Sequence, residues 1–139
     1  MKKFFTLLLL SFSFVLAAAE INWQTDFAAA AKAAKETKKP VVMLFTGSDW
    51  CPPCMRMAKE TWQNAAVIDY VNKNCIPLLV DLPRRKQLPP EQVRKNQQLA
   101  EKYKLQFVPT IVVTDADGKE LGRTGFNMPD DFLTFLKKY

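Results

Sequence analysis

Residues 41–54 read Val-Val-Met-Leu-Phe-Thr-Gly-Ser-Asp-Trp-Cys-Pro-Pro-Cys, an apolar run that leads directly into a pair of cysteines. The first five residues are apolar without alternation, which is typical of a strand buried on both faces. Gly47-Ser48-Asp49 then interrupt the run, and a helical pattern begins at Pro52. The stretch therefore predicts a buried strand that delivers Cys51 to the first turn of a helix.

The place of Cys51 at a helix N-terminus predicts a reactive thiol. Free N–H groups and the positive end of the helix dipole favour the thiolate over the thiol. Pro52 and Pro53 have no N–H, so the nearest amide that can reach the Cys51 sulfur is that of Cys54. We infer that Cys51 is the attacking and more exposed thiol. Cys54, one turn into the helix, is then the buried thiol that resolves a mixed disulfide.

Three other roles for the two cysteines fit the sequence less well. A structural disulfide between residues three apart adds only about 2 kcal/mol in the chain-entropy model. A zinc site needs four nitrogen or sulfur ligands, and the chain has one further cysteine and no histidine. Unpaired core cysteines disagree with the loop-like Asp49, Trp50 and prolines around them. Because the lack of histidine also excludes Ser-His-Asp and Cys-His catalysis, the sequence favours dithiol redox chemistry without a metal or cofactor.

The 139 residues, 48% hydrophobic and 24% charged, predict a single globular domain. The first expected helix is capped by Thr25 or Asp26 and ends near Thr37, and the Pro52 helix continues to about Trp62 with Met55, Ala58 and Trp62 on one face. A short helix over Val67–Val71, a strand over Cys75–Asp81 and a loop over Pro83–Pro90 follow. The remaining elements are a helix over Glu91–Tyr103 with Val93, Leu99 and Tyr103 facing inward, strands over Thr110–Thr114 and Glu120–Gly125, and a last helix over Pro129–Lys138.

The connections between these elements predict a mixed sheet. A long crossover joins the first two strands, which implies that they are parallel. Asp117-Gly118 predicts an antiparallel hairpin between the last two. Pro77 cannot donate to a strand ladder, so it is expected at the beginning of its strand or on an unpaired side. Together these features predict an α/β sandwich with helices on both faces of the sheet.

Two short motifs resemble those of the thioredoxin superfamily: Trp50-Cys51-Pro52-Pro53-Cys54 is similar to its active site, and Val108-Pro109-Thr110 to its cis-proline turn. The resemblance covers about Trp23 to Tyr139. It implies a thioredoxin fold with an extra N-terminal helix, a cis Pro109, a Val108 backbone that pairs with an extended substrate strand, and a substrate-facing Trp50. Residues 45–51 are most similar to exported thioredoxin-like proteins related to the soluble domain of DsbD-type transmembrane reductases.

One position departs from the family pattern. Thioredoxin itself has a buried Asp six residues before its first active-site cysteine, and that Asp assists proton transfer at the second cysteine. In this chain the position is Phe45. Either water carries the proton, or Asp49 or Glu60 substitutes for the missing carboxylate.

Residues 1–19 predict a secretory signal peptide, which leaves 20–139 as the thioredoxin-like domain. Lys2 and Lys3 precede the apolar run Phe4–Leu16, and Ala17-Ala18-Ala19 forms a small-residue cleavage pattern. A membrane anchor is the alternative, but the run is shorter than the roughly 20 residues that span hydrocarbon. We expect cleavage near Ala19 and a periplasmic or otherwise exported protein.

These observations predict an exported protein-disulfide oxidoreductase that acts as a reductase. The two prolines withhold amide donors, so the Cys51 thiolate should be stabilised less than in a strong oxidant. Protein substrates with disulfides or thiols and a membrane electron donor of the DsbD type are the implied partners, and a monomer is expected. A peptide-binding module without turnover and a specialised reductase of apocytochrome c thiols are the alternatives.

Three further features of the sequence bear on function. Cys75 fits a buried, inert thiol, with an intermolecular or regulatory disulfide as its alternative. Arg84-Arg85-Lys86 fits a solvated loop, with a docking patch for an acidic partner as its alternative. The scattered lysines lack interleaved aromatic residues, which argues against nucleic-acid binding.

Overall fold

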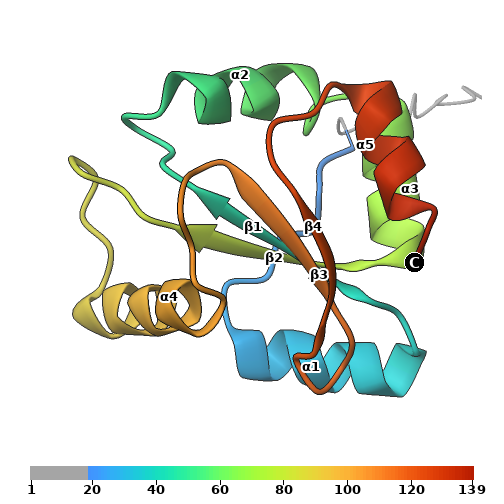
Figure 1. The fold of residues 1–139 in the computed structure, drawn as a ribbon, viewed down its shortest axis with the longest axis horizontal. Helices are drawn as coiled ribbons and strands as arrows, with labels where there is room; N and C mark the ends of the chain where they lie inside the picture. Colours follow the sequence, from blue (N-terminus) through green and yellow to red (C-terminus); the bar gives the residue numbers. More distant parts are fainter. Residues whose placement is uncertain (1–18) are drawn as a thin grey trace, which may run out of the picture.

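The computed structural model describes residues 19–139, so nearly all of the predicted signal peptide lies outside the described residues. A four-stranded sheet with the order β2-β1-β3-β4 forms the centre of the fold (Figure 1). The elements in chain order are α1 (Phe27–Thr37), β1 (Val41–Thr46), α2 (Pro52–Glu60), α3 (Ala65–Asn74), β2 (Ile76–Asp81), α4 (Pro90–Lys102), β3 (Thr110–Thr114), β4 (Glu120–Thr124) and α5 (Pro129–Leu136).

The strand pairing confirms the predicted mixed sheet. β1 pairs with β2 in parallel and with β3 antiparallel, and β3 pairs with β4 antiparallel. Gly118, in the β3–β4 turn, has a φ of 81°, which an Asp-Gly hairpin requires. Pro77 is the second residue of the edge strand β2, as its missing N–H predicts. On the outer side of β2, Gln24 accepts a hydrogen bond from the Leu79 amide and donates one to Pro77 O.

Two layers of helices cover the sheet, as predicted. Figure 1 shows α1 and α4 below it and α2, α3 and α5 on the other side. Val42 and Leu44 of β1 point toward the α2 side, where they join a core with Met57, Val71, Phe132 and neighbouring apolar residues. Val41, Met43 and Phe45 point toward α1 and α4. Since every residue of β1 is buried, the continuous apolar run is explained by contact with both layers.

Local sequence explains most helix boundaries, and α2 corrects one prediction. Asp26 caps α1 by accepting a hydrogen bond from the Ala29 amide. Helix α2 ends at Glu60, earlier than the predicted Trp62, and Met55 is 45% exposed whereas Trp62 is 7% exposed, so the two do not share a face as predicted. The buried residues of α2 are Cys54 and Met57, three residues apart, and they mark its inner face. Met55, one residue after Cys54, is turned toward solvent.

In residues 19–139 no helix is both long and apolar enough to cross a bilayer.

Phe132 gives a test of the core on the α2 side. Its ring is fully buried, 4.8 Å from the ring of Trp62 and at 79° to it. We expect Phe132→Ala to lower the free energy of unfolding by about 3–5 kcal/mol, because it leaves a cavity that the aromatic neighbours cannot fill. Urea unfolding measures the change. The control is Phe107→Ala, whose side chain is 64% exposed and whose loss should cost less than about 0.5 kcal/mol. Equal losses in the two variants would contradict this assignment of the core.

Candidate active site

Cys51 and Cys54 form a disulfide at the N-terminus of α2. Cys51 is the N-cap residue, and its Sγ accepts a hydrogen bond from the Cys54 amide at 3.3 Å. This is the amide that the two prolines predict. The helix begins at Pro52, so Pro52 and Pro53 take positions where an N–H has no partner within the helix.

The expected difference in exposure between the two cysteines is wrong for this disulfide form. Cys51 is 3% exposed and Cys54 is 4% exposed. Cys51 is covered because its Sγ lies 3.7 Å from the carbonyl oxygen of Val108, on a loop more than fifty residues later. Cys54 is covered because it lies between α2 and the sheet, where its Sγ accepts a hydrogen bond from the Gly47 amide at 3.5 Å.

The loop before β3 brings Val108 and Pro109 to the redox pair. The Val108–Pro109 peptide bond is cis. Pro109 is buried and Val108 is half-buried, with the Val108 carbonyl oxygen directed to Cys51 Sγ. Thr110 fixes the turn by donating its hydroxyl to Phe107 O at 2.7 Å.

Trp50 is attached to the segment that follows β2. Its indole Nε1 donates to Leu82 O at 2.8 Å, and the Arg84 guanidinium lies 3.7 Å from its ring centroid. The indole also occupies the space beside Gly47, where any Cβ would collide with it. The motif puts Trp50 next to Cys51, but these contacts, which hold it half-buried, were not foreseeable from the motif.

The segment after β2 is held to the active-site loop by Asp49. The Asp49 carboxylate accepts hydrogen bonds from the amides of Arg84, Arg85 and Lys86 at 3.0, 2.8 and 2.6 Å. These bonds, first that from Arg84, lower the pKa of Asp49 to about 2. The loop predicted to be solvated thus exposes its three basic side chains while its backbone is fixed.

Neither carboxylate proposed as a proton acceptor is directed to Cys54. Asp49 is occupied by the three amides, and Glu60 pairs with Arg56 at 3.1 Å. Phe45 is fully buried, with its ring 6.3 Å from that of Tyr103 on the opposite side of the sheet from α2. Of the interpretations derived from the sequence, proton transfer through water fits this arrangement best.

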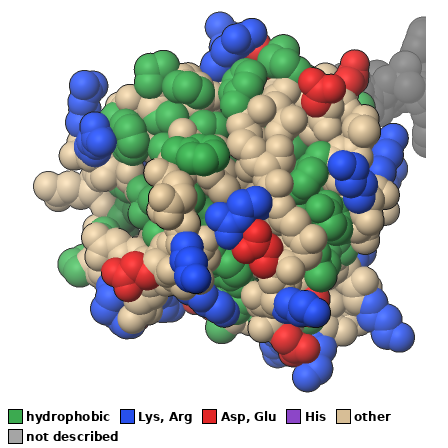
Figure 2. Space-filling model, viewed as in Figure 1, with side chains coloured by type: hydrophobic (Ala, Val, Ile, Leu, Met, Phe, Trp, Pro, Cys, Tyr) green, Lys and Arg blue, Asp and Glu red, His purple; other side chains and the backbone are tan. Residues whose placement is uncertain are grey.

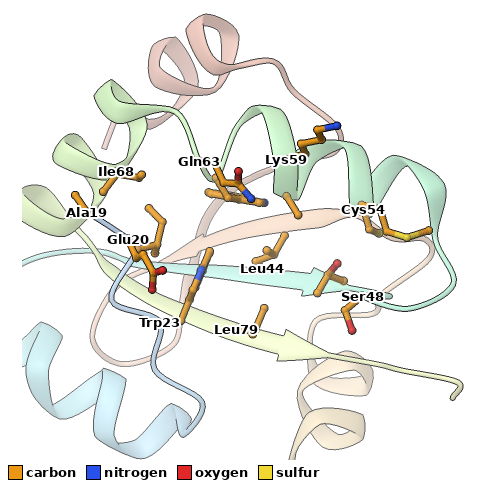
Figure 3. Close-up of a pocket in the computed structure, with 15 residues that line it drawn as sticks. Ala19, Glu20, Trp23, Leu44, Ser48, Cys54, Lys59, Gln63, Ile68 and Leu79 are labelled. Atoms are coloured by element: carbon orange, nitrogen blue, oxygen red, sulfur yellow. The ribbon is translucent and has the colours of Figure 1, made fainter. Parts of the chain in front are cut away.

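A groove of about 1000 Å³ runs from Cys54 along the inner side of α2. In Figure 3, Cys54 and Ser48 lie at one end, Ala19 and Ile68 lie at the other, and Trp23 and Leu79 lie on the lower side. Lys59 of α2 and Gln63 of the turn after it lie on the upper side. Glu20 and Lys59 are its charged residues. The groove gives water a path to the buried sulfur of Cys54.

Several large apolar side chains near the cysteines were missed by sequence reasoning. Phe107 is 64% exposed, Phe126 is 38% exposed and Met128 is 37% exposed. Phe107 lies beside Gly125, and Phe126 packs under the Arg56 guanidinium, whose carbon lies 5.4 Å from the ring centroid. Apolar side chains also cover the upper left of the face in Figure 2, over α2 and the loops beside it. The sequence offers one signal for this apolar surface: Phe107 directly precedes Val108, and Phe126 directly follows Gly125.

In residues 19–139 no three acidic or cysteine side chains converge in a way that could hold a metal ion.

Cys75, the third cysteine, is the C-cap residue of α3 and is 4% exposed. Burial raises the pKa of its thiol to about 11, partly offset by the charge of Lys39. The structure therefore supports the inert role predicted for it.

We expect Cys75 to resist alkylation in the folded, reduced protein. A pKa near 11 keeps it a thiol throughout the neutral range, and thiolate accumulates only as the pH approaches that value. Iodoacetamide at neutral pH should label Cys51 and spare Cys75 until denaturant is added, as mass spectrometry of peptides will show. Labelling of Cys75 at the rate of Cys51 in native protein would contradict its burial.

Comparison with known proteins agrees with this geometry. A family model described as a thioredoxin-like domain matches residues 27–139. Disulfide bond reductase DsbH of Chlamydia pneumoniae is 37% identical over 111 residues, which are 80% of this chain and 66% of that protein. Thioredoxin-related protein DsbJ of the same organism is 33% identical over 107 residues, 76% of this chain and 30% of that protein. The chain thus spans just under two thirds of the length of DsbH and under one third of the length of DsbJ.

Among solved structures, a DsbH oxidoreductase matches with a TM-score of 0.82 and 33% identity, covering 93% of this chain and 90% of that one. The reduced DsbD C-terminal domain of Neisseria meningitidis matches with a TM-score of 0.63 and 30% identity, covering 80% and 90%. The fold, the cysteine pair at the start of α2 and these matches lead to one conclusion: the chain belongs to the thioredoxin-like domain family.

Proposed function

We propose that this protein is an exported thiol–disulfide oxidoreductase that reduces disulfides of other proteins through Cys51 and Cys54. The observation that carries the proposal is the Cys51–Cys54 disulfide at the N-terminus of α2, with one amide on the Cys51 sulfur and the Val108 carbonyl beside it. The similarity to a named disulfide bond reductase supports the same activity.

Reduction of a substrate proceeds in two exchanges. The Cys51 thiolate attacks one sulfur of the substrate disulfide, a Cys51–substrate bond forms, and the other substrate sulfur leaves as a thiolate that takes up a proton. The Cys54 thiolate then attacks Cys51 Sγ, the Cys51–Cys54 bond forms, and the second substrate sulfur leaves and is protonated. The substrate gains two electrons and two protons, and the protein dithiol is oxidised.

The geometry favours the reducing direction. Among the described residues 19–139, only the Cys54 amide reaches Cys51 Sγ, because Pro52 and Pro53 offer no N–H in the first turn of α2. A thiolate with few donors is less stabilised, so the reduced form of the pair is less favoured and its electrons are more readily given up.

Protein substrates fit the surface around the pair. Val108 can pair through its backbone with an extended chain, and the half-buried Trp50 directly precedes Cys51. Phe107 and Phe126 add an exposed apolar area of the kind that marks protein contact sites. We propose that this surface takes apolar side chains next to the substrate cysteine.

The cellular setting follows from the same proposal. Cleavage near Ala19 would release residues 20–139 into the periplasm or an equivalent compartment as a monomer. Because that compartment is oxidising, the pair needs a source of electrons, and a membrane protein of the DsbD type is the proposed donor. The solved DsbD C-terminal domain has a related fold.

Redox titration and trapping test the proposed activity. We expect the mature protein, equilibrated in glutathione buffers, to show a potential near or below about −230 mV, typical of reducing thioredoxin-fold proteins. Cys54→Ser should trap a mixed disulfide on Cys51, seen as added mass, and Cys51→Ser should abolish turnover. Cys75→Ala is the matched control and should behave as wild type.

Other outcomes of this experiment are equally informative. A potential near about −120 mV would make the protein an oxidant. A function that survives Cys51→Ser would favour the peptide-binding module, and a pair that responds to no buffer would be structural.

The apolar surface gives a second test. Phe107→Ser should raise KM for a protein disulfide such as that of insulin several-fold, because an exposed aromatic contact is lost, while oxidised glutathione is reduced as before. Leu121→Ser is the matched control, since Leu121 is 44% exposed on β4 and lies next to Glu120, which pairs with Thr114 at the end of β3 away from Pro109. An unchanged KM in Phe107→Ser would remove Phe107 from the substrate surface.

A further inference from the structure

Asp81 is a buried carboxylate that the proposed reaction does not yet use. Asp81 is the last residue of β2 and is 5% exposed, and it pairs in the sheet with Thr46 of β1. Paired residues of parallel strands share a face, so Asp81 lies on the same side of the sheet as Thr46, Leu79 and α2. Burying a carboxylate costs free energy unless it is hydrogen-bonded. The groups that bind Asp81 therefore indicate its role.

Two hydrogen bonds to the Asp81 side chain come from Ser48, in the loop that leads to Cys51. The Ser48 amide donates to Asp81 Oδ1 at 3.1 Å, and the Ser48 hydroxyl donates to Oδ2 at 2.6 Å. Lys86 Nζ completes the site at 2.9 Å from Oδ2. In return, Asp49 of the same loop accepts hydrogen bonds from the amides that follow β2. The loop before Cys51 and the segment around the end of β2 therefore each supply a carboxylate that binds the other.

The residue before Ser48 links this carboxylate to the redox pair. The Gly47 amide donates to Cys54 Sγ at 3.5 Å. The direction of that N–H depends on the peptide plane that Gly47 shares with Thr46 and on the placement of the next residue, which Asp81 holds by two hydrogen bonds. Asp81 therefore acts on the Cys54 sulfur through Ser48 and Gly47, without touching it.

We propose that Asp81 is a positioning residue for resolution, keeping the Gly47 N–H on Cys54 Sγ so that Cys54 can exist as a thiolate when it attacks. The inference rests on the proposed function and names a determinant of its second exchange. Burial disfavours a charged sulfur, and Phe45 replaces the carboxylate that would assist proton loss. An aligned amide compensates by stabilising the anion.

The step itself is the second exchange described above. The Cys54 thiolate attacks Cys51 Sγ, the Cys51–substrate bond breaks, and the departing substrate thiolate is protonated by solvent. The proton that Cys54 loses beforehand passes to water in the groove beside it. The charged groups facing that region are Lys59 and Glu20 along the groove and Lys86 at Asp81.

Reaction with dithiobis(nitrobenzoate) separates the two exchanges in one stopped-flow trace. Attack by Cys51 on the reduced protein releases a first nitrothiolate, and resolution by Cys54 releases a second. We expect Asp81→Ala to slow the second phase about tenfold at neutral pH and to move its pH midpoint upward, with the first phase within twofold of wild type. Asp81→Asn retains one acceptor oxygen and should slow the second phase less.

Two further variants keep the test decisive. Ser48→Ala removes only the 2.6 Å hydroxyl bond and should slow the second phase severalfold, so it answers the question even where Asp81→Ala does not fold. Asp69→Ala is the matched control, because Asp69 is an exposed carboxylate on α3 paired with Lys73. It should leave both phases unchanged.

The outcomes distinguish this inference from the proposed function. Wild-type protein that releases only one equivalent of nitrothiolate would refute the dithiol mechanism itself. Two normal phases in wild type and an unchanged second phase in folded Asp81→Ala or Ser48→Ala would overturn the role of Asp81. Equal slowing of both phases would also overturn it, because Asp81 would then support the loop in general and not the Gly47 amide.

Discussion

The arrangement of the site depends on β1, which is hydrogen-bonded to a neighbour on each side. At its carboxyl end, Thr46 is paired with Asp81 and Phe45 with Thr110. The chain that leaves β1 toward Cys51 therefore emerges between two other segments. One carries the Val108 carbonyl to the Cys51 sulfur, and the other carries the carboxylate that holds Ser48. A single strand, paired on both sides, brings together three parts of the chain that are far apart in sequence.

The elements that sequence predicted well are those whose causes are local. The apolar run of β1 indicated burial on both faces, and Asp26 indicated the start of α1. Pro77 pointed to an edge strand because an absent N–H is a property of one residue. Met55 was wrongly placed on one face with Trp62, since Cys54 and Met57 are the residues of α2 that face the core and Trp62 lies beyond the end of the helix.

The site was predictable only in part for a similar reason. The Cys54 amide on Cys51 Sγ follows from two prolines and a helix start, all within four residues. The bonds from Ser48 to Asp81, and from the Arg84–Lys86 amides to Asp49, join positions more than thirty residues apart. Nothing in the local sequence distinguishes these aspartates from solvated ones. Their roles emerge only when β1 and β2 are aligned in register.

The contact between Gly47 and Trp50 has a consequence for how this protein can vary. The indole fills the place that a side chain at position 47 would need, while its Nε1 is tied to Leu82 O. The two positions therefore form one steric unit: a larger residue at 47 requires that the ring at 50 shrink or turn away from Leu82. Substitutions there are coupled, so a lineage passes from one compatible pair to another by paired changes, and each member of the pair limits which mutations the other can tolerate.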